Sequence, residues 1–176
     1  MEGLPVTARD VPVLIDLEGP ERERAVPVVR DGFEGIYRWH AKRTLRDIER
    51  VRALEVDATV VGVSMLEHLL PEVGYVYYVA VLTEWRQRGQ ASRLLDDALA
   101  WFSGSGVRVV YAAAEENNTA SLRLFRSRGF RVVERNEPRF SEGGLGAWGL
   151  RSRMRIVWGE VLLGLRLRPE PSAPSG

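Results

Sequence analysis

Apolar residues recur along the chain at two spacings, one that suits helices and one that suits strands. In the segment Gly35–Arg50, apolar side chains occur at Tyr37, Ala41, Leu45 and Ile48. A helix brings positions three or four residues apart onto one face. The segment is therefore predicted to be an amphipathic helix.

Strand patterns follow this helix. Two runs rich in β-branched residues lie within Ala53–His68 and are separated by Asp57 and Ala58, which predicts a hairpin. The next run, GYVYYVAV at Gly74–Val81, has β-branched and aromatic residues and no polar alternation. Such a strand is expected to be buried on both faces, in the middle of a sheet.

A second helical pattern follows the central strand. Its apolar residues are spaced 3, 1, 3, 1 and 3 positions apart, and they are Ala91, Leu94, Leu95, Ala98, Leu99 and Phe102. Gly104 and Gly106 are expected to end this helix, because glycine readily adopts the left-handed conformation that closes helices.

The rest of the chain alternates strand and helix again. Val107–Ala114 and Phe130–Glu134 are predicted strands, and between them Asn118 or Thr119 is expected to cap a helix that stops at Gly129.

The last predicted strand is Ile156–Leu167, with the odd-numbered residues from Val161 onward on one face. We expect this strand to lie at an open edge of the sheet. Its apolar run from Trp158 to Leu167 would then offer a surface for a homodimer.

This order of elements predicts an α/β (α+β) fold, in which helices flank a mixed, partly parallel central sheet. Residues 1–167 are expected to form a single domain. Arg135–Gly149, with three glycines in four residues, is predicted to be a long loop. The Pro- and Ser-rich tail Arg168–Gly176 is predicted to be disordered.

Composition narrows the classes of function. The chain has 176 residues, 45% of them apolar, and a formal net charge of +1. A near-neutral chain has no strong field to draw it to nucleic acid or to a membrane surface. With no cysteine and two histidines, thiol nucleophiles and histidine-rich metal sites are not expected. No apolar run is long enough to span a bilayer and the amino terminus lacks a signal pattern, so we expect a soluble cytoplasmic protein.

The candidate chemistry lies where the second helix begins, in the stretch RQRGQ at Arg86–Gln90. The first turn of a helix has unpaired N–H groups and the positive end of the helix dipole. Gly89 lets a bulky anion approach the backbone, and the two arginines add permanent charge. These features suit a pyrophosphate cradle. They also suit a solvated turn before an ordinary amphipathic helix.

A second motif favours the cradle. The R-x-x-G-x-A match at Arg86–Ala91 follows V-x-V at Val79–Val81, and NTASLRLFRSRGF begins further along, at Asn118. In this order the two motifs resemble those of the GNAT (GCN5-related N-acetyltransferase) family, over Thr59–Glu134. The resemblance implies an N-acetyltransferase whose sheet is splayed at the fourth strand and whose acyl donor is acetyl-CoA.

The resemblance also implies roles for individual residues. Backbone groups of Val79, Ala80 and Val81 would pair with the pantetheine arm of acetyl-CoA like an added strand. Asn118 would hydrogen-bond the far end of pantetheine, and Ser121 takes a position that the family fills with Ala or Ser. The pyrophosphate would be held by backbone amides and two arginine side chains in the segment that comprises Arg86, Gln87, Arg88, Gly89, Gln90, Ala91 and Ser92.

Two positions depart from the family pattern. Phe125 replaces a tyrosine that is credited with protonating the departing thiolate, and phenylalanine has no proton to donate. Ala113, twelve positions earlier, replaces a glutamate that acts as base in related enzymes that acetylate protein amino termini. Three explanations remain open: the thiolate leaves unassisted or through water, another residue substitutes, or the protein binds coenzyme A without efficient catalysis.

If another residue substitutes, Glu67 is our candidate for a base acting through water and Tyr78 for the proton donor to the thiolate. A backbone N–H near Val81 would polarise the carbonyl oxygen. Both side chains also have an ordinary interpretation, Glu67 as a polar residue at a strand end and Tyr78 as a core aromatic. Further candidates are His68, Tyr77, Glu115 and Glu116.

Other classes of protein suit the sequence less well. GSGVRV at Gly104–Val109 lacks the third glycine of a dinucleotide fingerprint and precedes a strand instead of following one. RSRMR at Arg151–Arg155 could serve a nucleic-acid module, but the balanced charge argues against one. The remaining rival is a non-catalytic acyl-CoA-binding or regulatory protein on the same fold. The acceptor, a small-molecule or peptide amine, would meet the Gly35–Arg50 helix and the Arg135–Gly149 loop, which carry no specific motif.

Overall fold

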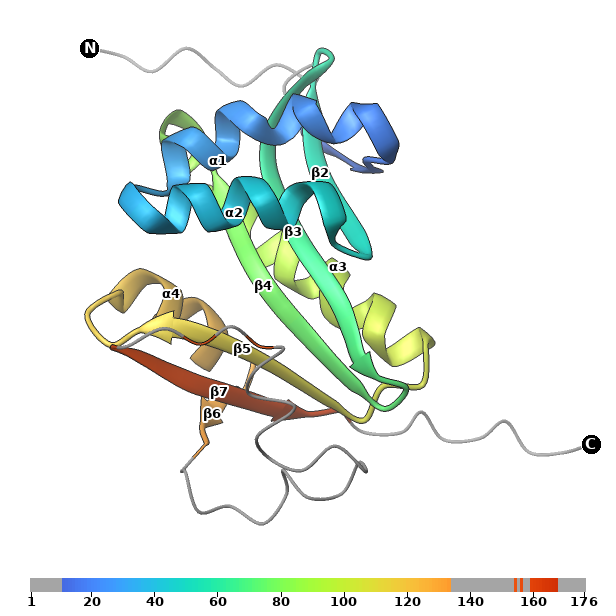
Figure 1. The fold of residues 1–176 in the computed structure, drawn as a ribbon, viewed down its shortest axis with the longest axis vertical. Coiled ribbons are helices and arrows are strands. Elements are labelled where there is room, and N and C mark those ends of the chain that lie inside the picture. Colours follow the sequence, from blue (N-terminus) through green and yellow to red (C-terminus); the bar gives the residue numbers. More distant parts are fainter. Residues whose placement is uncertain (1–10, 134–153, 155, 157–158, 168–176) are drawn as a thin grey trace, which may run out of the picture. The chain divides into compact units, whose positions relative to one another are not determined.

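A computed structural model describes residues 11–133, 154, 156 and 159–167 of the protein (Figure 1). The strands are β1 (Val13–Asp16), β2 (Arg50–Val56), β3 (Thr59–Leu70), β4 (Val73–Val81), β5 (Val109–Glu115), β6 (Arg131–Val132) and β7 (Glu160–Arg166). The helices are α1 (Val26–Gly32), α2 (Gly35–Asp47), α3 (Gln90–Gly104) and α4 (Thr119–Arg126), together with the 3₁₀ helices η2 (Gly19–Ala25) and η3 (Thr83–Trp85). Within the described ranges, none of these helices combines the length and the apolar character needed to cross a bilayer.

The predicted mixed α/β fold is confirmed. Strands of the described chain form one sheet in the order β1-β2-β3-β4-β5-β7-β6. β4 and β5 pair in parallel, whereas β1 with β2, β5 with β7 and β6 with β7 pair antiparallel. The parallel register covers Val73–Val76 of β4 and Val109–Ala112 of β5, although β4 continues to Val81. The register therefore ends within β4, as a splay at the fourth strand requires.

The chain divides into two compact units. The first unit comprises Met1–Met65 and Tyr78–Asp96, and the second comprises Leu66–Tyr77 and Asp97–Gly176. β3, β4 and α3 each pass from one unit into the other. The single domain over residues 1–167 stays a prediction.

The core of the first unit forms where β2, β3, β4 and the start of α3 meet. Leu54, Val61, Val81 and Leu94 are buried there together. Gly62 of β3 permits this packing, because a Cβ at that position would lie 3.2 Å from a methyl carbon of Leu94. Figure 1 shows α1 and α2 side by side in front of these strands and α3 behind them.

The predicted hairpin is confirmed. β2 ends at Val56, β3 begins at Thr59, and the two residues between them, Asp57 and Ala58, have φ of 46° and 62°. Positive φ at both central positions is the geometry of a type I′ turn, which matches the twist of the two strands.

The amphipathic helix predicted at Gly35–Arg50 is confirmed as α2, although it ends at Asp47. Ala41 and Leu45 are buried, as the stripe predicts. Ile48 is also buried and forms the residue after the helix.

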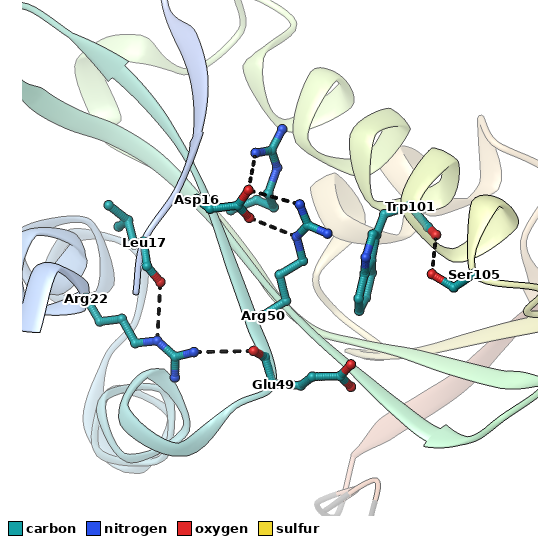
Figure 2. Close-up of polar contacts among 8 residues, drawn as sticks. Asp16, Leu17, Arg22, Glu49, Arg50, Trp101 and Ser105 are labelled. Carbon is teal, nitrogen blue, oxygen red and sulfur yellow. Dashed lines mark hydrogen bonds and ion pairs between the residues drawn. The ribbon is translucent and has the colours of Figure 1, made fainter. Parts of the chain in front are cut away.

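Arg22 of η2 meets the carboxyl end of α2. Its guanidinium donates to the carbonyl oxygens of Leu45 at 3.4 Å and Arg46 at 3.0 Å. It also donates to those of Leu17 and Glu49, at 3.3 Å each (Figure 2). The last turn of a helix leaves carbonyls without intrahelical partners. Arg22 therefore acts as a cap supplied from another element.

Three elements of the first unit, β1, η2 and α1, were not predicted from the sequence. β1 pairs antiparallel with β2 and ends at Asp16, whose carboxylate accepts from Arg50 at 2.8 and 3.0 Å and from Arg52 at 3.0 Å (Figure 2). These contacts join residues that lie far apart in the chain, so no local sequence pattern predicts the strand.

In the second unit, the core forms between β3, β4, β5 and β7. Leu69, Tyr75, Tyr111, Met154 and Leu162 are buried together there. Each of these four strands contributes a residue to the cluster.

The expectation that the last strand lies at an open edge is wrong. β7 begins at Glu160, after a turn at Gly159, and it lies between β5 and β6. Leu162 and Leu163 are both buried, so both faces of the strand are covered at these positions. The homodimer was predicted from an open edge at this strand, and β7 does not provide one. Trp158 lies outside the described residues.

The expectation that β4 is buried on both faces is wrong for its middle. Gly74–Val76 and Ala80–Val81 are buried, but Tyr77, Tyr78 and Val79 are partly exposed. The partly exposed residues follow directly after the position where the parallel register ends. Two further predictions, the loop Arg135–Gly149 and the tail Arg168–Gly176, lie outside the described residues.

Candidate functional site

The turn between β4 and α3 carries most of the predicted cofactor residues, and it lies in the first unit. After η3, Arg86 is extended, Gln87 has φ 59°, Gly89 has φ 78°, and α3 begins at Gln90. A left-handed residue other than glycine is uncommon and costs free energy, and such residues concentrate at functional sites. Turns of this kind aim successive backbone N–H groups into a concavity that suits an anion.

The N–H groups from Gln87 to Ser92 have no hydrogen-bond acceptor among the residues that the structure describes. The first bond of the helix runs from the N–H of Arg93 to the carbonyl of Gly89, at 3.0 Å. Residues Arg86–Gly89 are exposed, and a Cβ on Gly89 would meet no atom within 4 Å. The turn therefore offers a row of open donors with free space beside them.

The two arginines of the turn behave differently. Arg88 is exposed, and its guanidinium lies over the ring of Trp85, 5.2 Å from the centroid. Arg86 is directed inward: its Nε donates to the carbonyl of Val81 at 2.9 Å, and its Nη2 donates to the carboxylate of Asp31 at 3.1 Å. A role for Arg86 in holding a pyrophosphate stays a prediction, because its described contacts are internal.

Hydrogen bonds to β3 and to Arg86 hold the chain at the carboxyl end of β4. Val79 is partly exposed, whereas Ala80 and Val81 are buried. The N–H of Leu82 donates to the carbonyl of Val61 on β3, at 2.9 Å. Because the carbonyl of Val81 accepts from Arg86, that oxygen has a partner within the protein.

The second motif comprises the cap residue of α4, the whole helix and the turn after it, in the second unit. Asn118 is the cap residue, as predicted, and its side-chain oxygen accepts from the N–H of Ser121 at 3.0 Å. Capping uses the oxygen of the Asn118 amide and leaves its NH₂ group to donate elsewhere. The helix ends at Arg126, and Gly129, with φ 85°, completes the turn that follows.

Phe125 is 5% exposed, and its ring meets Phe130 edge-on at 5.1 Å between centroids. The residue that departs from the family pattern thus belongs to the core of the second unit. A pocket that was not predicted lies beside α4 and is lined by Thr119, Leu122, Arg123, Arg126 and Ser127.

The two candidate catalytic residues lie in different units. Glu67 is a partly buried residue of β3 in the second unit, and Tyr78 is a partly exposed residue of β4 in the first. The ring of Tyr78 meets Phe33 edge-on, with centroids 5.0 Å apart. His68 packs against Trp101, at 4.6 Å between centroids, which suits a core aromatic better than a base. The roles of Glu67 and Tyr78 stay predictions.

Comparison with known proteins identifies a family. The family model described as "Acetyltransferase (GNAT) family" matches residues 16–130. No curated protein matches the chain.

Solved structures share the fold. The ribosomal-protein-S18-alanine N-acetyltransferase of Escherichia coli is 14% identical, with a TM-score of 0.67 over 94% of this chain and 99% of that one. A GNAT family acetyltransferase from Elizabethkingia anophelis with acetyl-CoA bound is 14% identical, with a TM-score of 0.64 over 90% and 99%. The PaiA N-acetyltransferase from Thermoplasma acidophilum in complex with coenzyme A is 11% identical, with a TM-score of 0.65 over 89% and 99%. At these identities the likeness shows the fold alone.

Proposed function

The chain belongs to the acetyltransferase (GNAT) family, and from this premise we propose that it transfers an acetyl group from acetyl-CoA to an amine. The amine nitrogen bonds to the thioester carbonyl carbon and the carbon–sulfur bond breaks. The sulfur leaves as the thiolate of coenzyme A, and one proton passes from the amine to the thiolate or to solvent. Acetyl-CoA and coenzyme A in two structures of the same fold support this choice of donor.

The observation that carries the proposal is the row of open N–H groups from Gln87 to Ser92. A pyrophosphate is a dianion that needs several donors at once, and the positive end of the α3 dipole favours it. The left-handed residues Gln87 and Gly89 give these groups their direction. Arg88, exposed beside them, adds charge.

Two other segments complete the proposed donor site. Backbone groups of Val79, Ala80 and Val81 bind pantetheine as an added strand would. Of these, the carbonyl of Val81 already accepts from Arg86, so the N–H groups and the other carbonyls carry that pairing. The NH₂ group of Asn118 donates to the far end of pantetheine, since its oxygen caps α4.

The chemistry needs a neutral amine, because a protonated one has no lone pair. The pKa is about 10.4 for a lysine side chain and about 7.7–8.0 for a peptide amino terminus, so at neutral pH most of either amine must lose a proton before it can react. We assign this step to a water held by Glu67, and protonation of the thiolate to Tyr78, since Phe125 has no proton to give. A backbone N–H near Val81 polarises the carbonyl oxygen.

The acceptor is a small-molecule or peptide amine. One enzyme with the same fold is a ribosomal-protein-S18-alanine N-acetyltransferase. Peptide amino termini are therefore the first class of acceptor to screen. α2 contributes a face suited to contact an acceptor: Ile36 and Trp39 are 62% and 56% exposed. Arg43 lies over the Trp39 ring at 5.7 Å.

The proposal is tested by release of free thiol from acetyl-CoA in the presence of amines. The panel comprises peptides with different amino termini, lysine-containing peptides, polyamines and aminoglycosides, with the acetylated product identified by mass spectrometry. We expect thiol release that depends on both protein and amine. The rival function, a non-catalytic acyl-CoA-binding protein, predicts tight binding of acetyl-CoA with no amine that accelerates thiol release.

A further inference from the structure

Asp31, at the end of α1, is joined to the β4–α3 turn by several hydrogen bonds. Its carboxylate accepts from the N–H of Thr83 at 2.8 Å, from the Thr83 hydroxyl at 3.0 and 3.2 Å, and from Arg86 Nη2 at 3.1 Å. The same guanidinium donates through Nε to the carbonyl of Val81 at 2.9 Å. Asp31, Thr83, Arg86 and Val81 therefore form one network, which we call the Asp31 network, and all four residues lie in the first unit.

The two residues after Asp31 contact β4 as well. A Cβ on Gly32 would lie 3.0 Å from the Cβ of Ala80, so α1 approaches the strand as closely as glycine allows. The ring of Phe33 meets Tyr78 at 5.0 Å, and the carbonyl of Phe33 accepts from Arg38 of α2 at 2.8 Å. Asp31, Gly32 and Phe33 therefore lie beside the end of β4, where the proposed function places pantetheine binding.

The Asp31 network ends immediately before Gln87, whose left-handed backbone has a free-energy cost. Such a residue persists only where its surroundings hold it in place. Arg86, clamped between Val81 and Asp31, is the residue that fixes the chain directly before it. Without that clamp, we expect the turn to relax and the N–H groups from Gln87 onward to lose their common direction.

We propose that Asp31 is a positioning residue for the acyl donor: through Thr83 and Arg86 it holds the β4–α3 turn in the conformation that receives the pyrophosphate of coenzyme A. The inference rests on the proposed function, which supplies the ligand. It adds a residue outside both family motifs, and it assigns Arg86 to the support of the turn.

Electrostatics and positioning predict opposite signs for the loss of Asp31. A carboxylate near a pyrophosphate site repels the ligand. Removal of the Asp31 carboxylate would also leave the charge of Arg86 unpaired. Charge alone therefore predicts that the variant binds coenzyme A more tightly. That effect is small, because the Asp31 side chain is 34% exposed, it is paired with Arg86, and salt screens partly exposed charges. If Asp31 positions the turn, its removal must weaken binding instead.

The test is calorimetric titration of coenzyme A into the full chain and into Asp31→Ala, with thermal unfolding measured for each. Asp16→Ala is the matched control, because Asp16 also accepts from arginines at 2.8–3.0 Å, is 41% exposed and lies in the first unit. We expect both variants to lose some thermal stability. Asp31→Ala should raise the Kd about tenfold or more, which is about 1.4 kcal/mol. Asp16→Ala should change it less than about twofold, since the described partners of the Asp16 carboxylate are arginines of β2 and none belongs to the β4–α3 turn.

A wild-type protein that binds coenzyme A, with an Asp31→Ala variant that binds it equally or more tightly, overturns this inference and leaves the proposed function intact. A wild-type protein that does not bind coenzyme A contradicts the proposed function itself. If Asp31→Ala does not fold, Asp31→Asn replaces it, because an amide oxygen in the place of Oδ2 can still accept from the Thr83 N–H and from Arg86 Nη2 while the negative charge is lost. A folded Asp31→Asn variant that binds coenzyme A more tightly than the wild type overturns the inference, because removal of charge then outweighs positioning, whereas equal or weaker binding supports it.

Discussion

Tyr78 is the residue that we propose as the proton donor to the departing thiolate. Tyr78→Phe removes the hydroxyl and keeps the ring that meets Phe33. If Tyr78 is the proton donor, kcat should fall about a hundredfold while the Kd of acetyl-CoA stays the same, because general acid catalysis contributes about that factor. Tyr75→Phe is the control, since Tyr75 is 3% exposed in the core. An unchanged kcat in Tyr78→Phe means that the thiolate leaves unassisted or through water.

Ser64 of β3 is a buried hydroxyl, 0% exposed, with no hydrogen-bond partner in the described part of the chain. Ser64→Ala removes an unpaired polar group from the core, so the free energy of unfolding should rise by about 1 kcal/mol. Urea unfolding measures this change. Ser105→Ala, at an exposed serine that bonds to the Trp101 carbonyl, should shift it by less than about 0.5 kcal/mol (Figure 2). A loss of stability in Ser64→Ala contradicts the prediction.

The arginines of the turn show what sequence reasoning can resolve at this scale. The motif marks both Arg86 and Arg88 as basic residues at the start of a helix, which is correct for both. It cannot distinguish their directions, because the partner of Arg86 is Asp31, 55 positions away in the chain. No periodicity or motif places Asp31 in the turn, so the sequence analysis missed it.

At the scale of elements, the β2–β3 turn offers a test of local geometry. Ala58 has φ 62°, which suits glycine much better than alanine. Ala58→Gly should therefore raise the free energy of unfolding by about 1 kcal/mol, and the bond from Arg24 to the Ala58 carbonyl is unaffected. Ala53→Gly, at a buried position inside β2, should lower stability instead. Equal effects in both variants would contradict the turn geometry.

Long elements with a clear period were predicted well. The stripes of α2 and α3, the Asn118 cap of α4 and the Asp57–Ala58 turn depend on residues that are close in the chain, so their patterns are visible in it. β1 has four residues, and its stability comes from pairing with β2 and from Asp16. Short elements of this kind depend on tertiary contacts, which local propensity does not reveal.

At the scale of the whole molecule, the alternation of strand and helix was enough to predict a mixed sheet. The position of β7 between β5 and β6 was not predictable, because it depends on which strands pair across long stretches of chain.

The proposed function depends most on one interaction, the binding of the pyrophosphate of acetyl-CoA by the β4–α3 turn. Gly89 and Gly106 allow a closely matched test. They have φ of 78° and 81°, and a Cβ on either would meet no atom within 4 Å. Gly89 precedes α3 and Gly106 follows it, so Gly89→Glu and Gly106→Glu introduce similar backbone strain and the same charge at opposite ends of one helix.

The most direct measurement is calorimetric titration of acetyl-CoA into the wild-type protein and these two variants. We predict that the wild type and Gly106→Glu bind with similar affinity, and that Gly89→Glu raises the Kd at least about tenfold, because its carboxylate repels a phosphate from the open N–H groups. No binding by the wild type, or equal binding by the two variants, would contradict this prediction. The stretch RQRGQ would then be a solvated turn before the core helix α3.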